Sequence, residues 1–288
     1  MIFNSKTKIY LIACSNQLPI SYKANLNKIV YLLKKFNLNV VVSKNIFRNS
    51  EFLSNGKTRG AELNTVFKDK SITHIFDVSG GDLCNEILPY IDFDIIKEST
   101  AIYFGYSDLS VLLNAIYKKS DKHSFYYNIK TILSPQGLEN FYNTFLNKNS
   151  KFSLFSSWNY EWLLGDSMTG IILGGNVRCT LKLAGTEYIP SFKNNILFLE
   201  SNGGDINKIR SFLAQYNMLE VLENISGLII GEFTEITLKG QYNDLEKLCI
   251  DICTKHDIPL IKTNEIGHNI ESKGIVIGKY YDINHDHP

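Results

Sequence analysis

The chain lacks the features that mark a membrane protein or a binder of polyanions. Its 288 residues contain no run of about 18 apolar residues, so no transmembrane helix is expected. The 30 basic and 29 acidic residues leave a net charge of +1, which provides no field of one sign to attract nucleic acid or an anionic lipid surface. We therefore expect neither a nucleic-acid polymer nor a membrane among its partners.

Cysteine is also scarce, and the cysteines present do not follow the spacing of a disulfide framework or a metal site. The five cysteines are scattered and show no paired C-x-x-C spacing: Cys14, Cys84, Cys179, Cys249 and Cys253. This argues against a disulfide framework and a zinc site, and it suits a reducing compartment. The last two lie one helical turn apart, but their apolar neighbours favour core packing over metal binding. No cluster suggests a metal or an organic cofactor.

The amino terminus offers no export signal. The apolar run from Ile9 to Cys14 is too short for the core of a signal peptide and has no cleavage-like sequel, so it predicts a first strand. We expect a cytoplasmic protein. A hydrophobic fraction of 44% with 20% charged residues is a globular composition, and the length suffices for one large domain or two ordinary ones.

Apolar runs of strand length alternate with segments of helical apolar spacing. The predicted strands are 8–13, 38–42, 74–78, 101–104, 170–175, 196–200, 227–231 and 259–262, with an extended closing segment at 275–281. The predicted helices are 20–36, 59–69, 85–90, 109–117, 206–221 and 244–256, with shorter segments at 45–53 and 181–183. This alternation predicts an α/β layer fold with parallel sheets.

The pattern loosens after residue 126, and 150–166 is aromatic and polar without a clear period. We therefore expect an N-terminal α/β domain at 1–145, a linker region at 146–169 and a β-rich C-terminal α/β domain at 170–288. Ligands gather at the carboxyl ends of parallel strands. Two glycine-containing turns, 79–81 and 105–107, are predicted to lie at such ends.

The segment from Ala101 to Tyr117, AIYFGYSDLSVLLNAIY, has the layout of a nucleophile elbow. A short strand runs into a turn that holds Ser107, and a helix follows at once. Such a turn lifts the hydroxyl clear of the sheet, and the helix start directs its free N–H groups at an oxyanion. Leu109 replaces the second glycine of the G-x-S-x-G pattern. The alternative is that Ser107 or Asp108 only caps the helix.

Three polar residues end apolar strands or lie in glycine-flanked turns: Ser107, Glu200 and His268. A serine hydroxyl is a poor nucleophile until a base takes its proton, and the base needs a carboxylate to fix its tautomer. The chain order Ser, Glu, His is one that convergent hydrolases use. Taken singly, each residue also has a structural explanation: Ser107 as a helix cap, Glu200 as a solvated strand end and His268 as a loop histidine.

The order of these motifs resembles the S66 serine carboxypeptidases, which comprise the LD-carboxypeptidases of peptidoglycan recycling and the related microcin C immunity proteins. The similarity covers almost the whole chain. It is carried by the turn at 105–108, the helix–strand–GG segment at 59–81, the GGN, GT and LFLE series at 174–176, 185–186 and 197–200, the strand at 227–233 and the Gly267–His268 pair.

The resemblance implies roles for individual residues. Ser107 would be the nucleophile, His268 the general base and acid, and Glu200 its orienting partner. The backbone N–H groups of Asp108 and of Gly81 (or Gly80) would form the oxyanion hole. The resemblance also implies an active site in the cleft between the two domains, and a homodimer.

The substrate implied is a small peptide or an aminoacyl-nucleotide. Trp158 and Trp162 could stack a nucleobase, or simply pack the domain junction, and we favour an immunity-type cleavage of an aminoacyl- or peptidyl-nucleotide over LD-carboxypeptidase activity. Asn176 and Asp82 are expected to line the pocket. A cation for a substrate carboxylate or phosphate is left open among Arg178, Lys182 and Lys208.

Two readings from other classes stay open. In one, Cys84 is the nucleophile of an amidotransferase-like enzyme and Ser107 is a helix cap. In the other, the chain binds a peptide or nucleotide without turning it over. A serine-directed fluorophosphonate probe separates both from a serine hydrolase.

Overall fold

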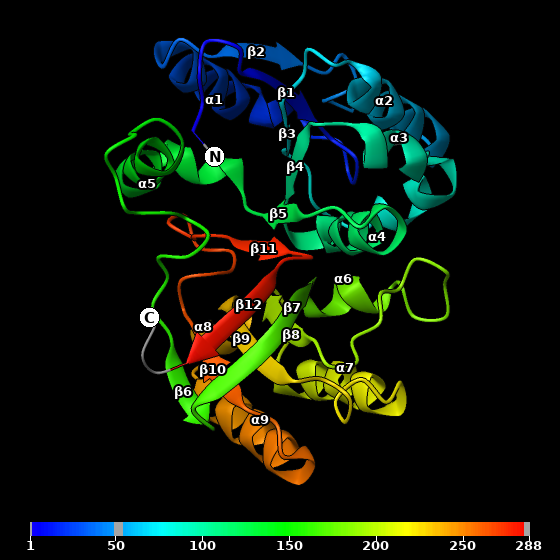
Figure 1. Cartoon of the computed structure of the whole chain (residues 1–288), viewed down its shortest axis with the longest axis vertical. Helices are drawn as coiled ribbons and strands as arrows, with labels where there is room; N and C mark the ends of the chain where they lie inside the picture. Colours follow the sequence, from blue (N-terminus) through cyan, green and yellow to red (C-terminus); the bar gives the residue numbers. More distant parts are fainter. Residues whose placement is uncertain (1, 49–53, 285–288) are drawn as a thin grey trace.

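The computed structural model describes residues 2–48 and 54–284, and within them the chain forms two stacked α/β units (Figure 1). The part of the expected segment 45–53 beyond Arg48 lies outside the described residues. The strands of the upper sheet are β1 (Lys8–Ile12), β2 (Asn39–Val42), β3 (His74–Asp77), β4 (Ile102–Gly105), β5 (Ser124–Tyr126) and β11 (Ile275–Ile277). Their order across the sheet is β11-β5-β4-β3-β1-β2, and all pairs are parallel except β11 with β5.

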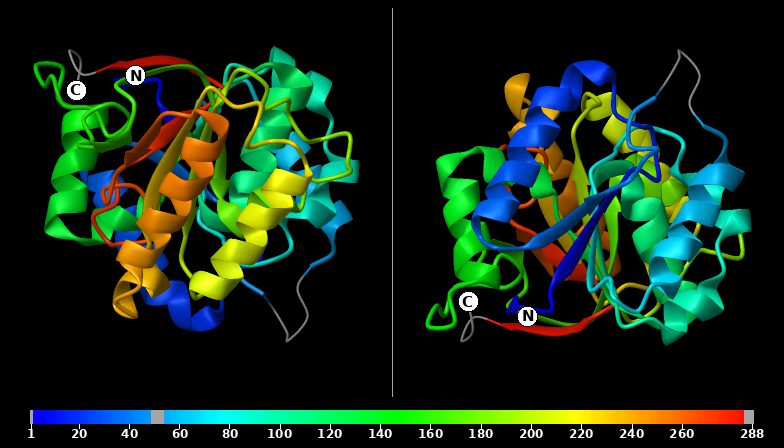
Figure 2. Two further views of the ribbon diagram at one scale, coloured as in Figure 1. Left: turned by 90° about the horizontal axis from the view of Figure 1, so that it is seen from below. Right: turned by 90° about the horizontal axis from the view of Figure 1, so that it is seen from above.

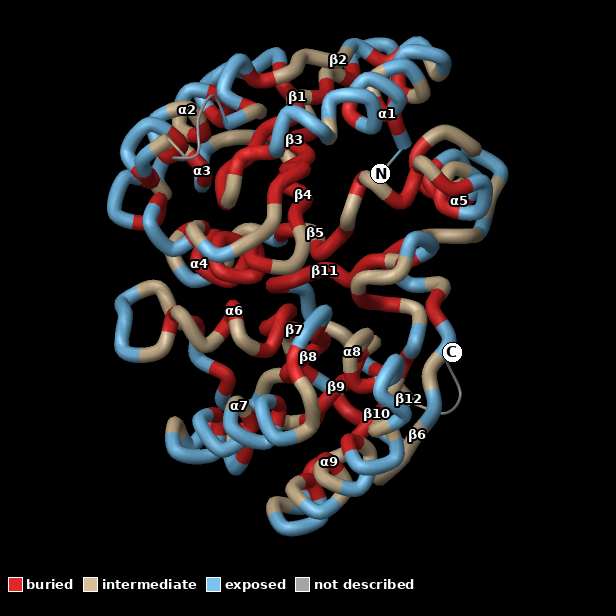
Figure 3. The backbone as a smooth tube through the Cα atoms, turned by 180° about the vertical axis from the view of Figure 1, so that it is seen from behind, coloured by how far each residue is buried: buried red, intermediate tan, exposed pale blue. Residues whose placement is uncertain are grey.

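Helices cover both faces of this sheet. They are α1 (Lys23–Lys35), α2 (Gly56–Lys68), α3 (Phe93–Glu98), α4 (Ser110–Ser120) and α5 (Pro135–Phe145). Successive strand residues point to opposite faces, so Phe76 and Phe104 pack with the α1 and α5 side while Ile75 and Tyr103 pack with the α2 to α4 side. Figure 3 shows the result as buried strands with exposed outer helix surfaces.

The lower sheet has the order β12-β7-β8-β9-β10-β6. Its strands are β6 (Glu161–Leu164), β7 (Ser167–Asn176), β8 (Ile196–Ser201), β9 (Gly227–Phe233), β10 (Leu260–Lys262) and β12 (Tyr280–Asn284). Its helices are α6 (Val177–Leu181), α7 (Ile206–Met218), α8 (Thr234–Leu238) and α9 (Tyr242–His256). The views in Figure 2 show α7 and α9 side by side on one face. The edge strands β12 and β6 are antiparallel to their neighbours.

The two-domain α/β architecture predicted from the sequence is confirmed. The expected linker 146–169 contains β6 and the first residues of β7, because this irregular sequence supplies an edge strand of the second sheet. Strand β11 returns to the first sheet, where it pairs with β5, before β12 joins the second sheet. The last part of the chain therefore ties both units together.

Helix α4 lies where the two units meet. Its residues from Ser110 to Ile116 are all buried, because the helix packs on the first sheet and also on β7 and α6. Buried side chains therefore occur on every side of this part of the helix rather than on one stripe, and the polar residues Ser110 and Asn114 are among them. Of the helices in the described part of the chain, none is long and apolar enough to cross a membrane.

Candidate active site

Ser107 occupies a strained turn between β4 and α4. Its φ is 58°, a value that few residues other than glycine adopt, and the 3₁₀ turn Ser107–Leu109 leads directly into the helix. A Cβ at Gly105 would lie 2.9 Å from the Cβ and Cδ1 atoms of Leu109, so only glycine fits at 105. Leu109, which stands where the G-x-S-x-G pattern has its second glycine, packs against Gly105. The Ser110 hydroxyl donates to the Ser107 carbonyl at 2.7 Å and closes the turn.

The phenol of Tyr126, in β5, connects the serine turn to the carboxylate of Glu200. It accepts a hydrogen bond from the Ser107 N–H at 3.0 Å and donates to Glu200 Oε1 at 2.6 Å. Burial and then the Glu200 charge raise the pKa of Tyr126 well above its ordinary value, so the phenol stays neutral. It therefore remains a donor to Glu200 at physiological pH.

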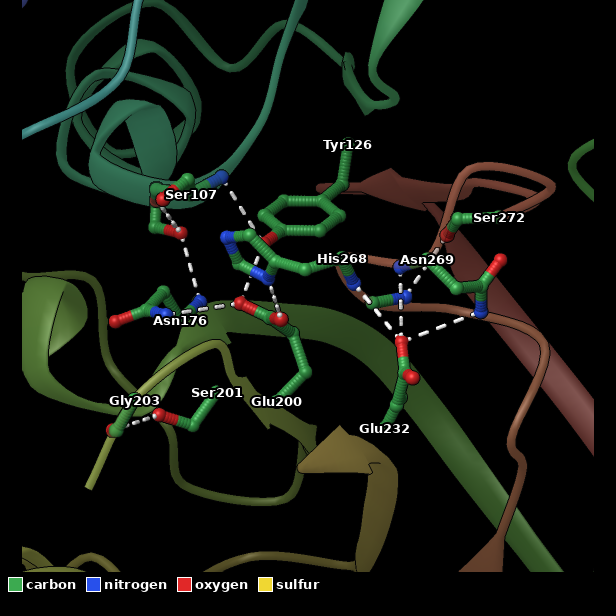
Figure 4. A network of polar contacts seen from close by, with 12 residues as sticks. Ser107, Tyr126, Asn176, Glu200, Ser201, Gly203, Glu232, His268, Asn269 and Ser272 are labelled. Atoms are coloured by element: carbon green, nitrogen blue, oxygen red, sulfur yellow. Dashed lines mark hydrogen bonds and ion pairs between the residues drawn. The ribbon is translucent and has the colours of Figure 1, made fainter. Parts of the chain in front are cut away.

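Glu200 is the penultimate residue of the buried strand β8 and is fully inaccessible to solvent. Its Oε2 atom lies 2.6 Å from His268 Nδ1, and its Oε1 atom accepts a second hydrogen bond from the Asn176 amide at 3.0 Å (Figure 4). The carboxylate is thus satisfied on both oxygens. A carboxylate against Nδ1 holds the proton there, which leaves Nε2 as the basic nitrogen.

His268 lies in the loop after β10, and a second carboxylate holds that loop. Glu232 Oε2 accepts the N–H groups of His268 and Asn269 at 3.1 and 3.0 Å. A Cβ at Gly267 would lie 2.5 Å from the Cβ of Glu232, so glycine is needed for this close approach. Burial of the imidazole lowers its pKa, but the negative charges of Glu200 and Glu232 outweigh burial, and the pKa is raised from 6.5.

In Figure 4 the ring nitrogen of His268 that does not contact Glu200 faces the Ser107 side of the site. Within the described residues no hydrogen bond joins the Ser107 hydroxyl to that nitrogen. Catalytic hydrogen bonds are often long or poorly aligned until substrate binds. A hydroxyl at a strained turn, an imidazole beside it and a buried carboxylate behind the imidazole are the parts that nucleophilic acyl transfer requires.

Asp108 connects the serine turn to the loop that carries Gly80 and Gly81. Its Oδ2 atom accepts from the Ser15 hydroxyl at 2.6 Å and from the Cys84 N–H at 2.9 Å, while its Oδ1 atom pairs with the Lys182 ammonium. Gly81 has φ 121°, and a Cβ there would overlap the Asn16 side chain. The two segments expected to carry oxyanion donors are therefore fixed to one another through one carboxylate.

Close backbone packing holds the two units together at the site. A Cβ at Gly175 would lie 2.3 Å from Ser110 Oγ, and one at Gly174 would lie 2.2 Å from the Phe198 carbonyl. Asn114 of α4 completes the contact, since its side chain accepts from the Gly174 N–H at 2.9 Å and donates to the Gly174 carbonyl at 2.7 Å. The glycines of the GGN series thus let β7 lie directly against the helix that follows Ser107.

Several residues predicted to bind substrate have other contacts. Trp158 is 6% exposed and lies in the core beside Tyr160, and Trp162 lies on edge strand β6 opposite Ile261. Trp158 precedes β6 and Trp162 lies within it, so both belong to the segment that supplies the edge strand of the second sheet. Asn176 is 5% exposed, and its side chain both donates to Glu200 and accepts from the Cys179 N–H, so it helps to position Glu200.

Asp82 and Cys84 also have contacts within the chain. Asp82 forms an ion pair of 2.6 Å with Arg178, so its carboxylate has a partner within the chain. Cys84 is fully buried, and burial followed by the negative charge of Asp108 raises the pKa of its thiol well above the ordinary value. A thiol in such surroundings is a poor nucleophile, which removes the amidotransferase-like alternative. The described residues contain no group of three His, Cys, Asp or Glu placed to hold a metal.

Tyr126, Glu232 and Asn114 were not anticipated from the sequence. Tyr126 and Asn114 act across strand pairs and domain contacts, which apolar periodicity does not report. Glu232 had a weak signal, because it is a carboxylate at the end of an apolar strand, as Glu200 is.

Comparison with known proteins identifies the class of enzyme that this fold and site define. The family sequence model of the LD-carboxypeptidase N-terminal domain matches residues 9–127. The family sequence model of the LD-carboxypeptidase C-terminal domain matches residues 169–283. The chain belongs to the S66 peptidase family and is a carboxypeptidase of the serine type.

Individual relatives and solved structures are similar to this chain over most of its length. A putative carboxypeptidase of Treponema pallidum is 28% identical over 86% of this chain and 81% of its own length. The structure of a microcin C7 self-immunity protein in complex with glutamyl sulfamoyl guanosine aligns with a TM-score of 0.82 at 20% identity, over 99% of this chain and 97% of the other. A muramoyltetrapeptide carboxypeptidase of Oxalobacter formigenes aligns at 0.78 and 22% identity, over 96% and 95%.

Proposed function

We propose that Ser107 is the nucleophile, His268 the general base and acid, and Glu200 its orienting carboxylate in hydrolysis of a terminal amide. The observation that carries this is the 2.6 Å contact between Glu200 and His268 Nδ1, made by a carboxylate that Tyr126 also connects to the Ser107 backbone. One buried group thereby sets both the imidazole tautomer and the position of the nucleophile turn.

The reaction follows from this arrangement. His268 Nε2 takes the Ser107 proton as the hydroxyl oxygen attacks the substrate carbonyl, and Glu200 stabilises the imidazolium that results. The imidazolium then gives its proton to the leaving amine, and an acyl-serine remains. Water attacks that ester with His268 again as base, which releases the acid and restores Ser107.

The oxyanion formed at each step needs donors, and the N–H groups of Asp108 and Gly81 are our candidates. Asp108 lies in the 3₁₀ turn that leads into α4, and Gly81 has the positive φ of a tight turn. Loss of one such donor typically costs about 100- to 1,000-fold in turnover.

The substrate that we favour is a peptide with a terminal carboxylate, cleaved as an LD-carboxypeptidase cleaves it. Family membership and the carboxypeptidase relatives support this choice. The preference for a nucleotide that the sequence suggested depended in part on Trp158, which packs in the core, and on Trp162 of edge strand β6.

An aminoacyl-nucleotide is the second candidate, and one contact favours it. The Tyr106 ring lies 5.3 Å from the His268 ring, centroid to centroid, and so offers an aromatic face beside the reacting groups. An aromatic face of this kind stacks a base in many proteins. The similar fold of an immunity protein solved with glutamyl sulfamoyl guanosine adds support.

A parallel turnover assay tests both substrates. One reaction holds an LD-linked tetrapeptide ending in D-alanine, the other an aspartyl sulfamoyl adenosine, and each is followed by mass spectrometry with Ser107→Ala as the control. Release of D-alanine that depends on Ser107 is the expected result. If a fluorophosphonate labels no serine, or labels Ser107→Ala as well, the proposed nucleophile is wrong. If Ser107 is labelled but neither compound turns over, both substrates are wrong.

A further inference from the structure

The cations suggested by the sequence for binding a substrate anion already have partners or lie elsewhere. Arg178 donates to Asp82 Oδ1 at 2.6 Å and to the Gly81 carbonyl at 3.2 Å. Lys182 pairs with the buried carboxylate of Asp108 and donates to the Asp82 carbonyl. Lys208 is an exposed residue of α7. A substrate carboxylate would have to compete with existing contacts for the first two.

Lys130 differs from all three. It lies in the 3₁₀ turn Ile129–Leu133 directly after β5, the strand that carries Tyr126. Its ammonium lies 4.9 Å from the centroid of the Tyr22 ring and 5.7 Å from that of Tyr106. Within residues 2–48 and 54–284 it forms no ion pair with a carboxylate and no side-chain hydrogen bond. Two aromatic faces are thus its main direct contacts.

The position of Lys130 relative to the reacting groups follows from the shared Tyr106 ring. That ring lies 5.7 Å from the ammonium and 5.3 Å from the His268 ring, so the ammonium is within about 11 Å of the imidazole centre. An extended peptide covers roughly 3.3 to 3.6 Å per residue. A carboxylate on the residue that leaves, or on the one beyond it, therefore comes within reach of Lys130.

The electrostatic surroundings leave this cation short of negative charge. Burial lowers the pKa of Lys130 to about 8, and the more distant charge of Asp77 only partly opposes this. The groups that face it are the phenols of Tyr22 and Tyr106, whose pKa values are themselves raised by burial, and the imidazole of His268, whose pKa the lysine charge lowers. Cation–π contacts recover only part of what desolvation costs an ammonium.

We propose that the Lys130 ammonium, held between Tyr22 and Tyr106, binds the terminal carboxylate of the substrate and so selects peptides with a free carboxyl end. This inference rests on the proposed function, since it assigns the substrate-recognition residue of the same site. A bound carboxylate supplies the missing counter-charge, and a carboxamide of the same shape does not. Selectivity between the two is therefore the property to measure.

The test measures binding without turnover. In a Ser107→Ala background, calorimetry gives the dissociation constants of an LD-linked tetrapeptide ending in D-alanine and of its D-alaninamide form. We expect the acid to bind about 10- to 100-fold more tightly than the amide, as loss of a charged hydrogen bond implies. Adding Lys130→Met should remove this preference while amide binding is kept, and Lys130→Arg should restore part of it. The preference should also fall as the pH rises through about 8, where the free lysine loses its proton.

Lys35→Met is the matched control, because Lys35 lies 5.7 Å from the Tyr31 ring but on the exposed face of α1. It should leave the acid-to-amide ratio unchanged. A wild-type ratio near one, a preference that persists in Lys130→Met, or no binding of the acid overturns the proposal. If the ratio depends on Lys130 but the enzyme with Ser107 does not cleave the peptide, the carboxylate site stands and the proposed hydrolysis fails. If the acid-to-amide ratio is one but the enzyme with Ser107 cleaves the peptide, the proposed hydrolysis stands and the carboxylate site at Lys130 fails.

Discussion

Replacing Glu232 by glutamine should move the acid limb of the kcat/KM profile to lower pH. Glu232 Oε2 accepts the N–H of His268 at 3.1 Å, the N–H of Asn269 at 3.0 Å and the Asn269 amide at 3.2 Å. A glutamine oxygen at the same place keeps these acceptor contacts. The substitution therefore removes a charge near the imidazole with little change in the loop.

The size of the shift follows from Coulomb's law. The contact at the His268 backbone nitrogen puts the carboxylate roughly 7 Å from the imidazole, where a unit charge contributes about 0.6 kcal/mol at a dielectric constant of 80 and about 2.4 kcal/mol at 20. One pKa unit corresponds to about 1.4 kcal/mol, so the pKa of His268 should fall by about 0.4 to 1.7 units. Because the base must be neutral, activity should persist to correspondingly lower pH.

The assay is kcat/KM for peptide hydrolysis between pH 4.5 and 9, with Glu271→Gln as the control. Glu271 is an exposed carboxylate of the same loop, so its loss should leave the limb in place. If the acid limb of Glu232→Gln is unchanged or lies at higher pH, the Glu232 carboxylate does not stabilise the protonated imidazole. Equal shifts in both variants would mean that the whole loop had changed.

Three further changes test contacts at the site and in the core. Asn176→Ala removes a donor to Glu200 and the cap of α6, and should lower kcat about 10-fold with little change in KM in steady-state assays. Lys182→Met leaves the buried Asp108 carboxylate without its cation, and should lower the free energy of unfolding in urea by about 3 to 5 kcal/mol, much of it recovered when Asp108→Asn is added. Burial lowers the pKa of His74 to about 4, below its unfolded value of about 6.5, so folding favours the neutral ring; stability should fall as the pH drops from 6.5 towards 4, and His74→Leu should reduce the loss between pH 7 and 4.5 by about 2 to 3 kcal/mol.

The sequence offers candidate site residues where a polar residue follows an apolar strand or lies near its end. Ser107 after β4 and Glu200 at the end of β8 stand out because buried strands place their carboxyl ends at one edge of a sheet. His268 lies in a loop, and its glycine neighbour was the only local signal. The reason for that glycine, the close approach of Glu232, is visible only in three dimensions.

Helix α5 is not among the expected helices, although its sequence carries the signals of a helix start. Ser134 caps the Gly137 N–H at 2.9 Å, Pro135 takes the first helical position, and Leu138, Phe141 and Phe145 follow at helical spacing. The short strand β11 is a different case. Its residues read as one extended segment with β12, and only the turn at Gly278, with φ 88°, separates them into different sheets. The spacing of apolar residues indicates that a segment is buried, but it does not indicate which sheet the segment joins.

Strand pairing explains why Tyr126 can serve both units. In the register of β5, Tyr126 lies opposite Gly105 of β4 on one side and opposite Ile275 of β11 on the other. The first neighbour leads into Ser107, and the second follows the loop that carries His268. A slip of one residue in either pairing would turn the phenol to the opposite face of the sheet and break its contacts with Ser107 and Glu200 together. The return of the chain to the first sheet as β11 is therefore part of how the site is held, since it fixes the strand that joins the serine of one unit to the carboxylate of the other.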